Sequence, residues 1–125
     1  MNVELLNTGT ELMLGSVTNV CPAYFGRQLF PIGLRVSRQE TIPDGSAIRG
    51  ALLDAFPRCE ILLVTGGLGP TTDDVTREVT AELLGLPLVR SDSVARSIET
   101  RLGPQEHSTE RTHAAQAMAV PKAPA

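Results

Sequence analysis

The chain alternates between short runs of apolar residues and longer segments in which apolar residues recur every three or four positions. Short apolar runs bounded by glycine, proline or polar residues predict β-strands at residues 3–6, from about 34–36 onward, and at residues 61–64. Segments with a helical period predict helices at residues 19–30, 46–57, 75–84 and 92–102, and a further helix at residues 110–118. Strands that alternate with helices predict an α/β domain with a mainly parallel sheet.

Polar residues follow each predicted strand. Thr10 and Glu11 come after the first strand, Asp44 comes after the second, and the loop at residues 66–74 comes after the third. Ligands of parallel α/β sheets bind beyond the carboxyl ends of the strands. The three loops are therefore expected to meet at one edge of the sheet and to form a binding site there.

The loop after the third strand, within residues 65–78, carries the strongest chemical signal in the chain. Gly66, Gly67 and Gly69 allow tight turns and a close approach to a ligand, and the first amides of the following helix are suited to an anion. A Walker A loop is excluded because its Gly-Lys-Ser/Thr ending is missing, and a Gly-x-Gly-x-x-Gly loop is excluded because Thr72 occupies the place of the third glycine. The pattern indicates a different kind of phosphate-binding loop.

Two carboxylates in this loop have two interpretations. Asp73 and Asp74 would repel phosphate unless a cation lay between them, so a functional role implies a hard divalent ion such as Mg²⁺. Glu78 follows Asp74 by four residues, on the same face of the predicted helix. The alternative is structural, because acidic residues stabilise a first helical turn and Thr71-x-x-Asp74 resembles a capping box.

Composition narrows the class of protein. With 125 residues, 42% of them hydrophobic and 20% charged, the sequence predicts one globular domain. The net charge of −3 and the scattered basic residues argue against binding to nucleic acid or to an anionic membrane. The sequence has no secretory signal pattern and no apolar run long enough to span a bilayer, and its two cysteines are isolated. These features predict a cytoplasmic location.

Three separate motifs resemble one known family. Residues 7–15, the turn at Pro43 and Asp44, and residues 65–74 together resemble the N-terminal domain of CinA, the competence and damage-inducible protein. That domain belongs to the MoaB and MogA superfamily of molybdopterin-binding folds, in which a Gly-Gly-x-Gly loop leads to Asp-Val-Thr-x-Glu, as at residues 74–78. The resemblance covers about residues 3–120.

The resemblance implies a fold and two activities. The fold would be a three-layer α/β sandwich of the MoaB and MogA type. CinA N-terminal domains are associated with metal-dependent hydrolysis of the pyrophosphate bond of ADP-ribose, and MogA-type relatives with adenylylation of molybdopterin. Both activities handle the phosphate of a nucleotide, which agrees with the loop chemistry above.

Two features depart from the family pattern. Asn19-Val20-Cys21 stands where CinA-like chains commonly have Asn-Thr-Asn, so the chain departs from the family in the polar contact that this helix would supply. The sequence also ends before the family's Gly-Thr-Ala-Pro-Gly segment, its proline-rich loop and the C-terminal deamidase-like domain. Residues 1–120 are accordingly expected to form a C-terminally truncated domain, with residues 121–125 as a tail.

The resulting hypothesis is a nucleotide pyrophosphatase that cleaves ADP-ribose-type substrates with a divalent metal, Mg²⁺. Asp74, Asp44 and Glu11 are the candidate catalytic residues, and Asp44 and Asp74 are the candidate metal ligands. The candidate ligand-binding residues are Gly9, Thr10, Gly66, Gly67, Gly69, Thr71, Asp73 and Glu78. The expected partner is a nucleotide or pterin phosphate, and a homo-oligomer is expected. The alternatives are a binding module without turnover and an inactive fragment.

Overall fold

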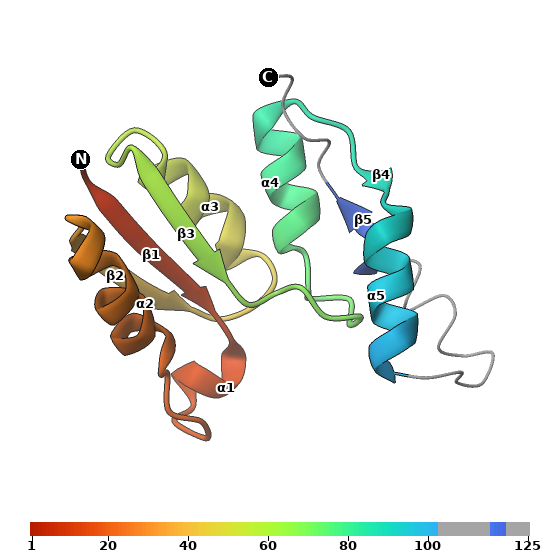
Figure 1. The fold of residues 1–125 in the computed structure, drawn as a ribbon, viewed down its shortest axis with the longest axis horizontal. Helices are drawn as coiled ribbons and strands as arrows, with labels where there is room; N and C mark the ends of the chain where they lie inside the picture. Colours follow the sequence, from red (N-terminus) through yellow and green to blue (C-terminus); the bar gives the residue numbers. More distant parts are fainter. Residues whose placement is uncertain (103–115, 120–125) are drawn as a thin grey trace.

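The computed structural model describes residues 1–102 and 116–119 (Figure 1). Its strands are β1 (Val3–Thr8), β2 (Val36–Ile42), β3 (Ile61–Thr65), β4 (Val89–Arg90) and β5 (Met118–Ala119). Its helices are α1 (Thr10–Met13), α2 (Cys21–Leu29), the 3-10 helix η1 (Phe30–Ile32), α3 (Ala47–Ala55), α4 (Thr76–Leu84) and α5 (Asp92–Leu102).

The central sheet has the strand order β2-β1-β3, and β1 pairs in parallel with both neighbours. Helix α2 lies on one face of this sheet and α3 on the other (Figure 1). Leu6 belongs to the core cluster that contains α3, while Leu5 points to the opposite face, and both are only 2% exposed. The predicted α/β layering with a mainly parallel sheet is confirmed.

The larger core lies between the sheet and helices α3 and α4. Its fully buried members are Leu6, Ile48 and Leu52, joined by Ile42 at the end of β2. Burying one such aliphatic side chain contributes about 1.5–3 kcal/mol to folding. The helical period of α4 extends this cluster, because Val79 and Leu83 of that helix pack against it. The core therefore fixes where β3 ends and where α4 begins, which are the two ends of the glycine loop.

Strand β1 is two residues longer than predicted, because it includes the polar residues Asn7 and Thr8. Asn7 is fully buried, and its side chain donates to the backbone carbonyl of Glu40 at 3.2 Å and accepts from the hydroxyl of Thr65 at 2.9 Å. A buried amide with partners in both neighbouring strands is compatible with a strand interior. The sheet thus continues to the edge of the glycine loops.

Several short elements were not predicted. Helix α1 is a single turn inside the predicted glycine loop, and β4 and β5 form an antiparallel ladder of two residues each. The predicted strand near residues 34–36 continues to Ile42 through a polar segment, because β2 lies at the edge of the sheet and leaves several side chains exposed.

The helices predicted at residues 46–57, 75–84 and 92–102 are confirmed, with ends within two residues. The helix predicted at 19–30 is shorter, because it begins at Cys21 and passes into η1 at Phe30. The helix predicted at 110–118 is wrong at its end, because Met118 lies in β5, and its first residues lie outside the described ones. The tail predicted at 121–125 also lies outside them. Within residues 1–102 and 116–119, no helix has the length and apolar character that a membrane span requires.

Candidate functional site

Asp44 joins the loops that follow β1 and β2. The hydroxyl of Thr8 donates to Asp44 Oδ1 at 2.5 Å, and the backbone N–H of Thr10 donates to Asp44 Oδ2 at 3.0 Å. The backbone N–H of Gly9 also donates to the carbonyl of Ile42 at 3.0 Å. These bonds bring Asp44 and Thr10 together at the carboxyl edge of the sheet, and they engage both oxygens of the Asp44 carboxylate.

Gly66 and Gly67 lie in close contact with Thr8 and Thr76. Both have positive φ, 91° and 61°, where a side chain would be strained. A Cβ atom on Gly66 would lie 2.0 Å from the carbonyl oxygen of Thr8, and one on Gly67 would lie 2.1 Å from Thr76 Oγ1. Thr76 in turn donates its hydroxyl to the carbonyl of Gly66 at 3.0 Å and its backbone N–H to that of Gly67 at 3.2 Å. Packing against β1 and α4 is therefore enough to require glycine at both positions.

A compact turn follows the glycines. The backbone N–H of Thr71 donates to Asp74 Oδ2 at 3.0 Å, and the Asp74 N–H donates back to the Thr71 carbonyl at 3.1 Å. The Thr71 hydroxyl lies within hydrogen-bond distance of both Asp73 Oδ1 and Asp74 Oδ2, and can donate to one at a time. A Cβ atom on Gly69 would lie 2.5 Å from Asp74 Oδ2, so this glycine makes room for the carboxylate.

The hydrogen bond from the Thr71 hydroxyl lowers the pKa of the Asp74 carboxyl below its usual value of 3.8, against the opposing effect of partial burial. Backbone N–H groups of Thr71 and Gly69 and the charge of Arg77 lower this pKa further. Asp74 is consequently a carboxylate at neutral pH, placed directly after the glycine loop.

Only one part of the interpretation of the carboxylates as helix caps is confirmed. The Thr71 N–H to Asp74 bond is one of the two bonds of a capping box, but it closes an isolated turn. Helix α4 begins later, at Thr76, and its N-cap residue, Val75, makes no side-chain capping bond. Asp73 and Asp74 therefore precede the helix, and the prediction that they lie in its first turn is wrong.

The remaining candidates lie around this edge. Glu11 bends back over the first loop, because a Cβ atom on Gly9 would lie 2.6 Å from its Oε1. The Cβ of Asp73 lies 3.8 Å from the position of a Cβ atom on Gly45, so the loops after β2 and β3 approach each other. Glu78 is in the first turn of α4 and does not share a helical face with Asp74, which lies outside the helix.

The described residues contain no group of three or more histidine, cysteine, aspartate or glutamate side chains that could hold a metal ion. A Mg²⁺ site needs fewer protein ligands than that, because the ion commonly keeps several waters and binds through one or two carboxylates and the substrate's phosphates. The donor chemistry of Asp44 and Asp74, both carboxylates, fits such an ion.

Sequence reasoning missed two residues at this edge. Thr8 and Thr76 are buried and hold the glycine loop from both sides, through contacts with Gly66 and Gly67. Thr8 lies two residues after the strand predicted at 3–6, and Thr76 is the second residue of the helix predicted at 75–84; these positions are a signal that could have found them. Their hydrogen bonds to backbone and carboxylate partners are long-range contacts, which local patterns do not specify.

Together, the parallel sheet and the loops at its carboxyl edge define an α/β domain of the class that binds small ligands beyond the ends of its strands. Residues 4–123 match the family described as a probable molybdopterin binding domain, and the chain belongs to this family. A CinA-like protein of Akkermansia muciniphila is 45% identical over 100 residues, which are 80% of this chain and 24% of that protein. A putative competence-damage inducible protein of Acetivibrio thermocellus is 41% identical over 101 residues, with shares of 80% and 24%.

The chain therefore spans about a quarter of the length of these curated relatives. Among solved structures, the protein CinA from Thermoplasma acidophilum superposes with a TM-score of 0.78 at 27% identity, over 96% of this chain and 70% of that one. The molybdopterin biosynthesis Mog protein from Mycobacterium ulcerans superposes with a TM-score of 0.62 at 21% identity, over 95% and 80% of the two chains. The second similarity concerns the fold alone. The predicted resemblance to CinA and to the MoaB and MogA fold is confirmed.

Proposed function

We propose that this domain hydrolyses the pyrophosphate bond of an ADP-ribose-type nucleotide with the help of a divalent metal ion, Mg²⁺. The observation that carries the proposal is the position of Asp74, an ionised carboxylate held by Thr71 directly after a glycine loop at the carboxyl edge of a parallel sheet. The similarity to CinA-like proteins supports the same reaction class through the resemblance described above.

Each part of the edge has a role in this proposal. The backbone of Gly66, Gly67 and Gly69 binds the phosphates, and the hydroxyl of Thr71 joins it by turning from the aspartates to the ligand. Asp44 and Asp74 would hold the metal ion, which when bound neutralises phosphate charge and lowers the pKa of a coordinated water. Asp74 orients the attacking water, and Glu11 assists from the neighbouring loop.

The remaining candidates define the rim of the site. Gly9 and Thr10 approach the ligand from the loop after β1, and Asp73 from the turn before α4. Glu78 approaches from the first turn of α4. Thr10 and Asp73 are both exposed, which leaves them accessible to a ligand from solvent.

One observation favours a second function, binding without turnover. The family's own description concerns binding, and an anion site built from backbone N–H groups needs no metal-ligating side chains. In this alternative the carboxyl edge retains a nucleotide or a pterin phosphate, in keeping with the family's description as a probable molybdopterin binding domain.

Product analysis with ADP-ribose and Mg²⁺ separates the two functions. The wild-type domain should release AMP and ribose 5-phosphate, and Asp74→Asn should lower the rate by about 100-fold or more, because a misplaced water and ion cost at least that much. Asp54→Asn is the matched control, since Asp54 is an exposed aspartate on α3, outside the loops that follow β1, β2 and β3.

Three outcomes are decisive. Full activity of Asp74→Asn would contradict its catalytic role. Wild-type protein that binds ADP-ribose in a calorimetric titration but releases no product would establish the binding module. Protein that neither binds nor cleaves ADP-ribose would overturn the proposal for this nucleotide altogether.

A further inference from the structure

A hollow lies beside the glycine loop, on the side that faces α5. It has a volume of about 570 Å³ and is lined by Leu68, Arg77, Ile98, Arg101 and Gln116. Leu68 is the residue between the glycines of the loop, and its side chain is 48% exposed. The hollow is therefore continuous with the loop but has a different chemistry, with two guanidinium groups and an apolar wall.

Arg77 supplies a guanidinium that is largely withdrawn from water. Its side chain is 16% exposed, and NH1 donates to the carbonyl of Gln116 at 2.8 Å. The NH2 group lies 4.0 Å from Glu78 Oε1, which is a weak ion pair at the limit of contact. Among the described residues, the buried Nε–H of Arg77 has no hydrogen-bond acceptor. Leaving such a donor unpaired is unfavourable, so a small shift of the Arg77 side chain that brings Nε–H to a ligand acceptor in the hollow would stabilise the arrangement.

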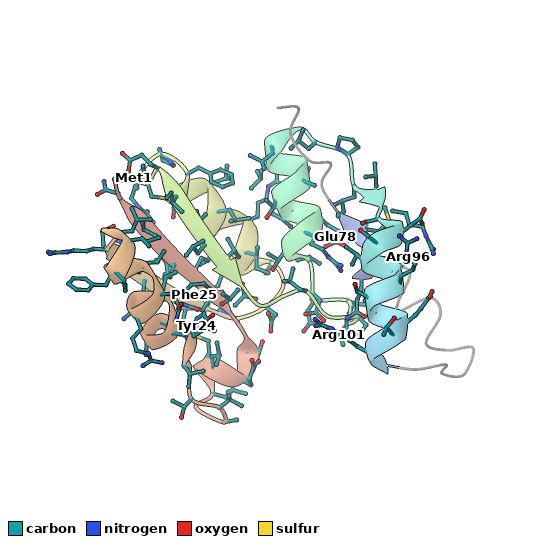
Figure 2. The ribbon with its side chains drawn as sticks, viewed as in Figure 1. Met1, Tyr24, Phe25, Glu78, Arg96 and Arg101 are labelled. Atoms are coloured by element: carbon teal, nitrogen blue, oxygen red, sulfur yellow. The ribbon has the colours of Figure 1, made fainter. Side chains whose placement is uncertain are left out.

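Arg101 supplies the second positive charge from a different element. It is an exposed residue near the end of α5, and within residues 1–102 and 116–119 it takes part in no ion pair. Figure 2 shows Arg101 extending from α5 towards the loop after β3, whereas Arg96 on the same helix extends away from that loop. Two arginines from separate helices thus converge on one hollow.

We propose that Arg77 and Arg101 form a second anion subsite, which binds a phosphate group next to the glycine loop. Guanidinium groups match phosphate oxygens with paired N–H donors, and two of them balance the charge of about −2 that a phosphate monoester carries near neutral pH. The apolar wall of Leu68 and Ile98 covers the organic part to which that phosphate is attached. The inference rests on the proposed function only in placing a nucleotide or pterin phosphate at the glycine loop.

The phosphate has two sources that the hollow alone does not distinguish. It can be a second phosphate of the molecule that occupies the glycine loop, since Leu68 belongs to both sites. It can also be a separate phosphate ion. Competition distinguishes them, because ADP-ribose should displace inorganic phosphate from Arg101 only when one ligand spans both sites.

Titration with inorganic phosphate at constant ionic strength tests the subsite without requiring turnover. In the wild-type domain, phosphate should shift the NMR signal of the Arg77 Nε–H group. Arg101→Gln should weaken phosphate binding by about tenfold, because one charge-assisted contact is lost. Arg96→Gln removes the same charge from the same helix and should leave the affinity unchanged. Arg77→Lys keeps the charge but loses the paired donors, and should weaken binding several-fold.

Equal phosphate affinities for Arg101→Gln, Arg96→Gln and the wild type, or an unmoved Arg77 Nε–H signal, would overturn the subsite. ADP-ribose hydrolysis is a separate readout. A domain that cleaves no ADP-ribose but loses phosphate binding only on Arg101→Gln would contradict the proposed function and leave the subsite in place. A domain that cleaves ADP-ribose but binds phosphate equally well with and without Arg101 would support the proposed function and contradict the subsite.

Discussion

The carboxyl edge of the sheet contains two aspartate–threonine pairs that differ in what they connect. Thr8 and Asp44 are 36 residues apart, and their hydrogen bond joins the loops of two strands. Thr71 and Asp74 are three residues apart, and their bonds close a turn within one loop. We call the first pair the junction and the second the turn. The junction connects the loops that follow β1 and β2. The turn fixes the position of the Asp74 carboxylate within one loop and, among the described residues, connects it to no other strand.

The largest effect is expected where the glycine loop meets the junction. Gly66→Ala should lower the free energy of unfolding by about 3 kcal/mol or more, because its Cβ would lie 2.0 Å from the Thr8 carbonyl and φ is 91°. Gly50→Ala is the control, since Gly50 lies in α3 with open space around it, and alanine should stabilise the helix by about 0.5–1 kcal/mol. Urea unfolding of both variants measures the difference. If Gly66→Ala has the same free energy of unfolding as the wild type, the glycine loop can move away from Thr8 without loss of stability.

Removing the junction carboxylate should have the next largest effect. Asp44→Ala leaves the Thr8 hydroxyl and the Thr10 N–H without their acceptor, which should cost about 2 kcal/mol. Asp54→Ala, at an exposed position of α3, should change stability by about 0.5 kcal/mol or less. Thermal melting of the two variants provides the comparison. Equal melting temperatures would show that Asp44 does not hold the two loops together.

The contrast between the pairs explains what the sequence could predict. The helices α3 and α4 were predictable because each has apolar residues at the helical spacing, Ile48 and Leu52 in α3 and Val79 and Leu83 in α4. These residues pack in the same core. The convergence of three loops was predictable because parallel strands place their carboxyl ends at one edge.

The junction bonds were not predictable. They depend on pairing between segments far apart in the chain, as does the burial of Asn7 between Glu40 and Thr65. The two-residue strands β4 and β5 carry no periodic signal at all. Glu78 was grouped with Asp74 by helical spacing, and this failed because α4 begins only at Thr76.

The turn should affect the pH dependence of stability through the lowered pKa of Asp74. Because the pKa of Asp74 is lowered in the folded domain, its charge stabilises the fold above the unfolded value of about 3.8, and this contribution is lost as the pH falls through the folded value. Asp74→Asn lacks the contribution at every pH. The gap in melting temperature between wild type and Asp74→Asn should therefore narrow as the solution is acidified below pH 4.

Other carboxylates do not obscure this comparison. Glu4 also has a lowered pKa, because of its hydrogen bond with Arg58, and so does Glu60 through a backbone hydrogen bond from Asn2. Both groups are present in the wild type and in the Asp74 variant, so their contributions cancel in the difference. A gap that stays constant from pH 7 to below 4 would contradict the lowered pKa of Asp74.

The smallest effect on stability is expected from the hydroxyl of the turn. Thr71 is exposed, and among residues 1–102 and 116–119 it bonds only to neighbours in its own loop, so Thr71→Ala should change the free energy of unfolding by about 0.5 kcal/mol. The same substitution should raise the pKa of Asp74 towards its ordinary value, because the Thr71 hydroxyl is the largest cause of the lowered pKa. NMR titration of the Asp74 carboxyl carbon measures that pKa. Thr8→Ala is the matched change at the junction. It should lower the free energy of unfolding by more than Thr71→Ala does, and it should leave the pKa of Asp74 unchanged. If Thr71→Ala destabilises the domain as much as Thr8→Ala does, the turn is part of the structural frame and the distinction between the two pairs is wrong.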